Sequence, residues 1–96
     1  MIYKIVIIDE AKEDYKKSLF WYKNINQKLG IKFNESFKNS LKLIQSNPLQ
    51  FQIRYDNTRV KIFKSFPYLI HYTVYNNTIV IKQICHSSQV SDLNIY

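Results

Sequence analysis

The side chains with the clearest chemical potential are basic residues in the second half of the chain. Cationic donors on a rigid sheet can hold phosphates, and an imidazole with a pKa near 6.5 can move a proton during attack of a 2′-hydroxyl on RNA. Exposure of polar residues on the wet face of an antiparallel sheet explains any one of them equally well. The candidates are Arg54, Arg59, Lys61, Lys82 and His86, with His71 close by.

The two histidines are expected to have different roles. His86 lies near a strand end at the start of a polar segment, and we expect it to be the functional histidine. His71 is expected opposite Lys82 as a neutral, solvent-facing imidazole. Ser87 and Ser88 follow His86, but adjacent strand residues point to opposite faces and no acidic residue is placed to orient the imidazole. This disfavours a Ser–His hydrolase.

Other chemistries lack the residues they need. A single glycine leaves no Gly-rich phosphate loop, and one cysteine with two histidines gives no zinc-binding spacing. We therefore expect no cofactor and no metal. Cys85 has no second cysteine for an internal disulfide, so the chain does not need an oxidising compartment.

Length and charge limit the number of domains and the kinds of partner that we expect. The 96 residues fit one domain (residues 1–96), and 46% hydrophobic residues indicate a packed protein. A formal charge of +7 favours an anionic partner: nucleic acid, an acidic protein or a membrane surface. The apolar run over residues 1–8 is too short for a signal peptide or a transmembrane helix, so we expect a cytoplasmic protein.

The first half of the chain reads as a strand followed by two helices. Residues 2–8 are β-branched and apolar, which is typical of a strand, and Asp9 is a good N-cap. Apolar residues then recur at helical spacing up to a break at Asn26, and again up to Asn47-Pro48. The predicted buried faces are Ala11, Tyr15, Leu19, Tyr22 and Ile25 in the first helix and Leu29, Phe33, Phe37, Leu41 and Ile44 in the second.

The second half alternates as strands do, over residues 58–63, 68–75 and 78–86. Asn76-Asn77 suits a two-residue hairpin turn. Pairing Tyr75 with Thr78 places His71 opposite Lys82 and Tyr68 opposite Cys85. The predicted fold is α+β with the order β-α-α-β-β-β. A helical hairpin covers one face of a mainly antiparallel sheet, the first strand is inserted in that sheet, the opposite face carries the polar groups, and residues 87–96 form a polar tail.

This order and several local features resemble the RelE/ParE superfamily of toxins from type II toxin–antitoxin modules, with the ParE-type branch favoured. The features are Trp21-Tyr22 late in the first helix, the apolar run ending at Asn47-Pro48, Arg54 and Arg59 ahead of the strands, Phe66-Pro67-Tyr68, and His86 ending the last strand. The resemblance covers residues 1–88. It implies a small cytoplasmic toxin that is neutralised by a cognate antitoxin, whose extended, partly helical segment wraps the toxin. The basic charge suits an acidic antitoxin.

The superfamily divides by target. RelE-type members are ribosome-dependent mRNA endoribonucleases that use several Lys and Arg and a C-terminal Tyr or His. Here Leu69 stands where that type commonly has Arg, and no Lys/Arg cluster follows His86. Electrostatic stabilisation is often the largest catalytic contribution, so these losses favour the ParE-type role, which is non-enzymatic poisoning of DNA gyrase. Gln89 departs from the Arg that ParE-type relatives often have there.

Three hypotheses follow. The first is a toxin that binds a protein target such as DNA gyrase, with the five basic candidates contacting target or antitoxin. The alternative is a ribosome-dependent mRNA endoribonuclease, in which Arg59 and Lys61 hold phosphate and His86 acts as acid or base. The third is a nucleic-acid binder whose affinity falls steeply with salt. None of them involves a membrane.

Overall fold

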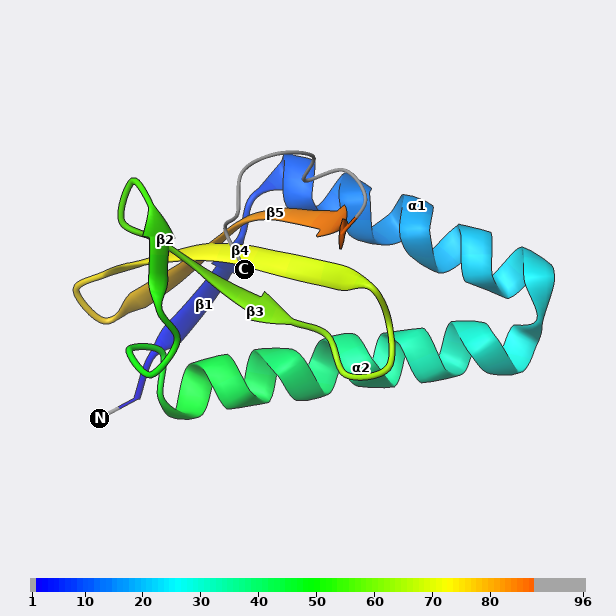
Figure 1. The fold of residues 1–96 in the computed structure, drawn as a ribbon, viewed down its shortest axis with the longest axis horizontal. Helices are drawn as coiled ribbons and strands as arrows, with labels where there is room; N and C mark the ends of the chain where they lie inside the picture. The colour runs from blue at the N-terminus through cyan, green and yellow to red at the C-terminus, as the bar shows by residue number, and fades with distance from the viewer. Residues whose placement is uncertain (1, 88–96) are drawn as a thin grey trace.

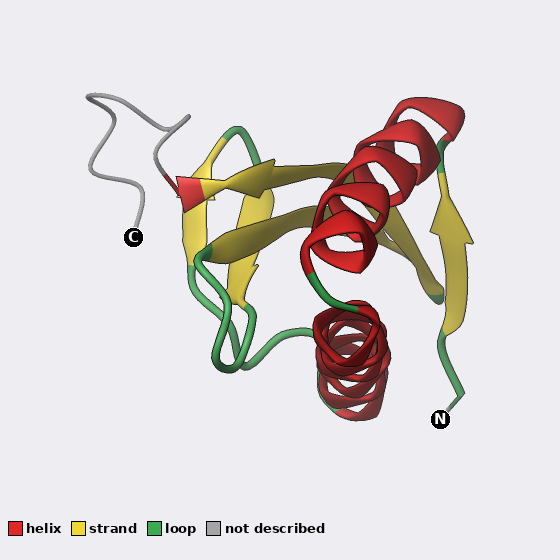
Figure 2. Ribbon diagram, turned by 90° about the vertical axis from the view of Figure 1, so that its right-hand side faces the viewer, coloured by secondary structure: helices red, strands yellow, loops and turns green. Residues whose placement is uncertain are grey.

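Five strands form one sheet, and both helices lie on one of its faces (Figure 1 and Figure 2). The computed structural model describes residues 2–87. In chain order the elements are β1 (Lys4–Ile7), α1 (Asp9–Ile25), α2 (Gln27–Ser46), β2 (Ile53–Tyr55), β3 (Thr58–Ile62), β4 (Tyr68–Tyr75) and β5 (Thr78–His86). The predicted α+β class and helical hairpin are confirmed, and β2 is an additional strand. Nearly all of the predicted tail, residues 88–96, lies outside the described part.

The sheet order is β1-β5-β4-β3-β2, with β1 parallel to β5 and the other neighbours antiparallel. The expectation that the first strand is inserted in the sheet is wrong, because β1 forms one edge. The edge strand is only four residues long. The end of α2 reaches it, since Gln45 Nε2 donates to the carbonyl of Tyr3 at 2.7 Å. A short edge strand tied to a helix offers little surface for aggregation.

The helical hairpin follows the sequence pattern closely. Asn26 ends α1 and caps α2, because its side chain accepts from the backbone N–H of Lys28 at 2.8 Å. Helix α1 begins at Asp9 itself, one residue before the prediction implied. Ile25 was expected in the core but is exposed, because the end of the hairpin extends past the sheet (Figure 1).

The core fills the space between the helices and the sheet. Phe33 of α2 is fully buried at its centre, and its ring lies 5.1 Å from those of Tyr22 and Tyr68 and 5.3 Å from that of Phe63. Tyr72 is fully buried, and its hydroxyl donates to the carbonyl of Pro48 at 2.7 Å. Since a buried hydroxyl needs a partner, this bond also fixes the start of the segment after α2.

The β4–β5 hairpin contains a bulge that the sequence prediction missed. Pairing runs as expected from Tyr75 opposite Thr78 to Tyr72 opposite Ile81, and then shifts by one residue at Lys82. His71 therefore pairs with Gln83, and Tyr68 pairs with His86. Simple alternation would have turned Gln83 and Cys85 toward the helices. The bulge turns Ile84 toward them instead, so burial of an apolar residue accounts for the shift. No helix in residues 2–87 is long and apolar enough to cross a membrane.

Candidate functional site

The predicted basic residues lie on both faces of the sheet. Arg59 pairs with Tyr72 and Lys61 with Ile70, and these partners belong to the core under the helices. Since residues directly opposite each other share a face, Arg59 and Lys61 lie on the helix side. The expectation that they lie on the open face with Lys82 is wrong. His86 pairs with Tyr68 of the same core, so it lies on the helix side as well, and its expected place on the open face is also wrong. Their stems run along the side of the sheet that also buries Phe63.

Arg59 holds the segment between α2 and β2. Its Nη1 donates to the carbonyl of Phe51 at 2.6 Å and, more weakly, to that of Leu49 at 3.3 Å. A charged donor on two backbone carbonyls is a strong local restraint. The structure therefore gives Arg59 a clear structural role at the outer strands.

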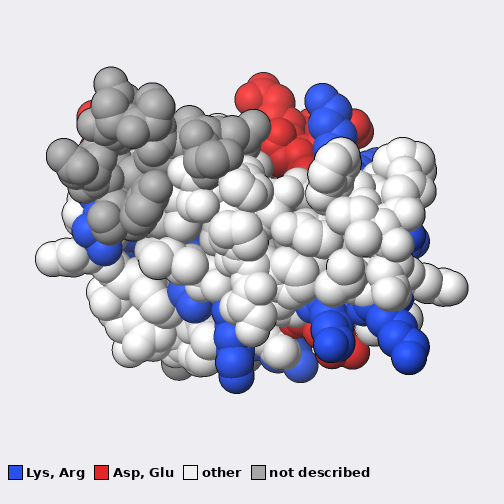
Figure 3. Space-filling view, turned by 45° about the vertical axis from the view of Figure 1, so that its right-hand side comes forward, with Lys and Arg blue, Asp and Glu red and all other residues white. Residues whose placement is uncertain are grey.

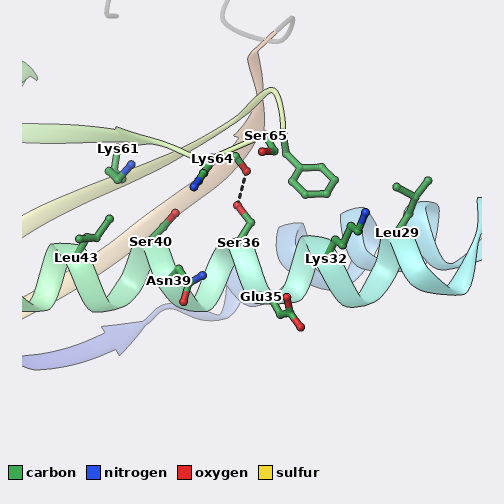
Figure 4. A pocket seen from close by; sticks show the side chains of 11 residues that line it. Leu29, Lys32, Glu35, Ser36, Asn39, Ser40, Leu43, Lys61, Lys64 and Ser65 are labelled. Carbon is green, nitrogen blue, oxygen red and sulfur yellow. Dashed lines mark hydrogen bonds between the residues drawn. The ribbon is translucent and has the colours of Figure 1, made fainter.

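Lys61 lies at the outer side of β3 beside α2. Its ammonium donates to the carbonyl of Ile62 at 2.6 Å and lies 5.6 Å from the ring centroid of Phe51. Desolvation by burial lowers the pKa of Lys61. A groove of about 550 Å³ opens next to it between α2 and the β3–β4 connection (Figure 4). Its lining includes Leu29, Lys32, Ser36, Leu43, Lys64 and Phe66.

The face away from the helices carries a polar cluster around His71. The side chain of His71 is only 2% exposed, so the expectation of a solvent-facing imidazole is wrong. Its Nδ1 shares a hydrogen bond with the Tyr55 hydroxyl at 2.7 Å, and its Nε2 lies 3.4 Å from Cys85 Sγ. Lys82 Nζ donates to Thr58 Oγ1 at 2.8 Å. Tyr55 belongs to β2, a strand that the sequence pattern did not reveal.

Burial sets the protonation of this cluster. Desolvation, and then the charge of Lys82, lower the pKa of His71, which favours the neutral imidazole. Desolvation and then Asp14 raise the pKa of Cys85 to about 11. A neutral imidazole beside a protonated thiol is a packed polar cluster and lacks the reactive thiolate of a nucleophilic site.

Leu69 belongs to the same face. It is 1% exposed and forms a buried cluster with Val60 and Cys85. The position where an RNA-cleaving relative commonly has Arg is thus part of an apolar cluster. Gln89, the other departure noted in the sequence, lies outside the described residues.

His86 lies at the far end of β5. Its ring meets that of Tyr68 edge-on with centroids 5.1 Å apart. Counting strand spacings and residues along β4, its backbone is about 16 Å from that of Arg59 and about 12 Å from that of Lys61. Arg54 lies on β2, exposed, beside a hollow of about 410 Å³ that Lys61 also lines. The structure brings Arg54 and Lys61 together and leaves Lys82 and His86 elsewhere.

The cations that remain near one another follow α2 and β3. Helix α2 has four lysines and one acidic residue, Glu35, whereas α1 has four of each. Figure 3 shows Lys and Arg side chains along its lower edge, where α2 runs, and a group of acidic side chains at its upper edge, over α1. Residues 2–87 contain no group of three or more His, Cys, Asp or Glu that could hold a metal ion.

The fold and these features define a small basic α+β domain with a helical hairpin on one face of its sheet. Comparison with known families identifies it: a family described as ParE toxin of type II toxin-antitoxin system, parDE, matches residues 5–91, so the chain belongs to this toxin family. A solved structure, the chromosomal ParDE TA system from P. aeruginosa, is similar in fold with a TM-score of 0.76 and 17% identity. The match covers 88% of this chain and 96% of that one. No curated protein sequence matches.

Proposed function

We propose that this ParE-family chain acts in the cytoplasm as a growth-arresting toxin that binds and inhibits a protein target, and that a cognate acidic antitoxin neutralises it. The candidate target is DNA gyrase, which the ParE-type resemblance implies. One observation favours this function over RNA cleavage. Arg59, Lys61 and His86, the three residues that a ribonuclease would use, are separated in the structure.

The separation bears directly on catalysis. In-line transfer at a phosphate needs cations and a proton-transferring group within hydrogen-bond reach of the same few atoms. Arg59 is bound to the carbonyls of Phe51 and Leu49, and Lys61 lies beside α2. His86 is the last residue of β5, and its chain neighbour Cys85 pairs with the buried Leu69. This arrangement supports recognition of a protein and gives RNA cleavage little support.

The experiment that tests the proposal begins with induction of the gene alone. Growth arrest is expected, and co-expression of a neighbouring short acidic reading frame should restore growth. Purified protein should inhibit gyrase supercoiling at micromolar concentration. Full supercoiling in the presence of a protein that does arrest growth would refute gyrase as the target.

The ribonuclease alternative has its own readout in the same cells. Primer extension on cellular mRNA after induction should show no new ends. New ends that vanish in the His86→Ala variant would replace the gyrase proposal with a RelE-type activity. Thermal unfolding of the purified His86→Ala variant then separates a loss of folding from a loss of chemistry.

A further inference from the structure

The outer edge of β3 is only partly covered. Strand β2 pairs with β3 at Thr58 and Arg59 and goes no further. Phe63 donates its N–H to the carbonyl of Tyr68 at 2.9 Å, so the alternation of an antiparallel ladder turns the backbone groups of Ile62 away from β4. Within residues 2–87, no strand pairs with Ile62 on that outer side. The edge at Ile62 is therefore a place where a further strand can add.

Lys61 occupies this edge. Its ammonium donates to the carbonyl of Ile62 at 2.6 Å, which is the acceptor that an incoming strand would use. Natural sheets often protect an edge with a lysine in this way. The one ion pair among the described residues joins Lys16 to Glu13, so Lys61 has a carbonyl and an aromatic ring as neighbours and no carboxylate. A carboxylate brought to this place would be a stronger partner for the ammonium than the carbonyl is.

The surroundings of Lys61 combine positive charge with apolar side chains. The groove of about 550 Å³ on one side includes Lys32 and Lys64, and the hollow of about 410 Å³ on the other includes Arg54. Leu43 and Ile62 are each 50% exposed here. Leu29 and Leu43 mark the two ends of the groove in Figure 4. Fourteen residues of helix separate them, or about 21 Å, which is the length of about six residues of extended chain.

We propose that an extended acidic segment of a partner protein adds as a strand to the outer edge of β3 at Ile62, and that one of its carboxylates takes Lys61 away from the Ile62 carbonyl. The freed carbonyl then accepts a backbone N–H of the added strand. Lys61 thus acts as a removable cap that admits a strand only if the strand brings an acid. This inference rests on the antitoxin part of the proposed function, because it supplies the place and the conformation of the bound antitoxin segment.

A peptide fits this edge better than a nucleic acid does. A strand edge offers an alternating donor and acceptor pattern that a peptide backbone matches and a phosphate backbone does not. The exposed Leu43 and Ile62 side chains match alternate apolar residues of an extended peptide.

The test uses a fluorescent peptide, acetyl-Val-Glu-Val-Glu-Val-Glu-amide, with the full-length protein. We expect saturable binding by fluorescence polarisation and slower hydrogen exchange at the Ile62 amide. Lys61→Glu should weaken binding at least tenfold. The matched control Lys38→Glu makes the same charge change at an exposed α2 position outside the groove and should change binding less than twofold. Thermal unfolding checks that both variants fold.

A second peptide tests the strand itself. N-methylation of alternate backbone amides keeps every side chain but removes hydrogen-bond donors, so binding should be lost. Equal binding of the methylated peptide, equal weakening by both lysine variants, or tighter Lys61-dependent binding of hexauridylate would each overturn the inference. These outcomes leave growth arrest and its rescue untouched. Conversely, a chain that fails to arrest growth would refute the proposed function without altering the peptide result.

Discussion

Replacement of Arg59 by Met tests whether this residue is a structural restraint. The change keeps the apolar stem and removes the guanidinium that holds the carbonyls of Phe51 and Leu49. A hydrogen bond to a charged group contributes about 1.5–3 kcal/mol, and the bond to Phe51 is short and part-buried. The bond to Leu49 is long and exposed, so we assign it almost nothing. The free energy of unfolding of Arg59→Met should therefore be about 2 kcal/mol lower than that of the wild type.

The assay is thermal and urea unfolding followed by circular dichroism. For a chain of this size, about 2 kcal/mol corresponds to a fall in Tm of about 10 °C. Lys38→Met is the matched control, and its Tm should stay close to that of the wild type because the side chain is exposed. A Tm of Arg59→Met within 2 °C of wild type would refute the structural role. Growth arrest lost at a temperature where this variant is fully folded would show a direct role in target or antitoxin binding.

Three further outcomes can be measured on the purified protein. Gly30→Ala should destabilise the protein in urea, because the new Cβ would lie 2.5 Å from Lys23 Cγ. This clash should outweigh the gain of up to about 1 kcal/mol that alanine brings in helix propensity. Adding Lys23→Ala should recover most of that loss, and a stabilised single variant would contradict the close approach of the helices. The pKa of His71 is lowered in the folded state by burial and Lys82, so the unfolded chain binds more protons below about pH 6.5 and stability should fall from pH 7.5 to pH 5. Urea unfolding at these two pH values should show a smaller difference in His71→Gln, and an equal difference would exclude His71 as the cause. With a pKa of about 11, only about one in a thousand Cys85 side chains is a thiolate at pH 8, so a chromogenic disulfide reagent should react slowly with native protein and rapidly in urea. Rapid reaction of the native protein would contradict the buried cluster.

The local pattern predicted the elements well. Helical spacing located both helices, and Asn26 marked their junction because its short side chain can cap a helix. Asn76 takes a positive φ of 54° at the hairpin turn, which asparagine tolerates better than most residues. These features depend on neighbours in sequence, so the sequence alone was enough to find them.

The faces of the sheet were harder to predict because they depend on distant contacts. The bulge at Lys82 is favourable only because the helix side has room for Ile84, and no local signal reveals that space. The assignment of Arg59 and Lys61 to the open face ignored a clue in the sequence. Phe63 alternates with them on the same side of β3, and a large aromatic residue usually marks the core side.

The charge of the chain is best understood by where it lies on the fold. Helix α1 balances its lysines with acids, whereas α2 and the strands after it have a large excess of cations. Three of these cations, Lys32, Lys61 and Lys64, line the groove, and the backbone of Lys61 is about 12 Å from that of His86. Cations gathered around apolar, strand-edge surface suit an acidic protein segment. Catalysis on RNA would need them around the histidine, so the distribution of charge favours recognition of a protein partner over RNA cleavage.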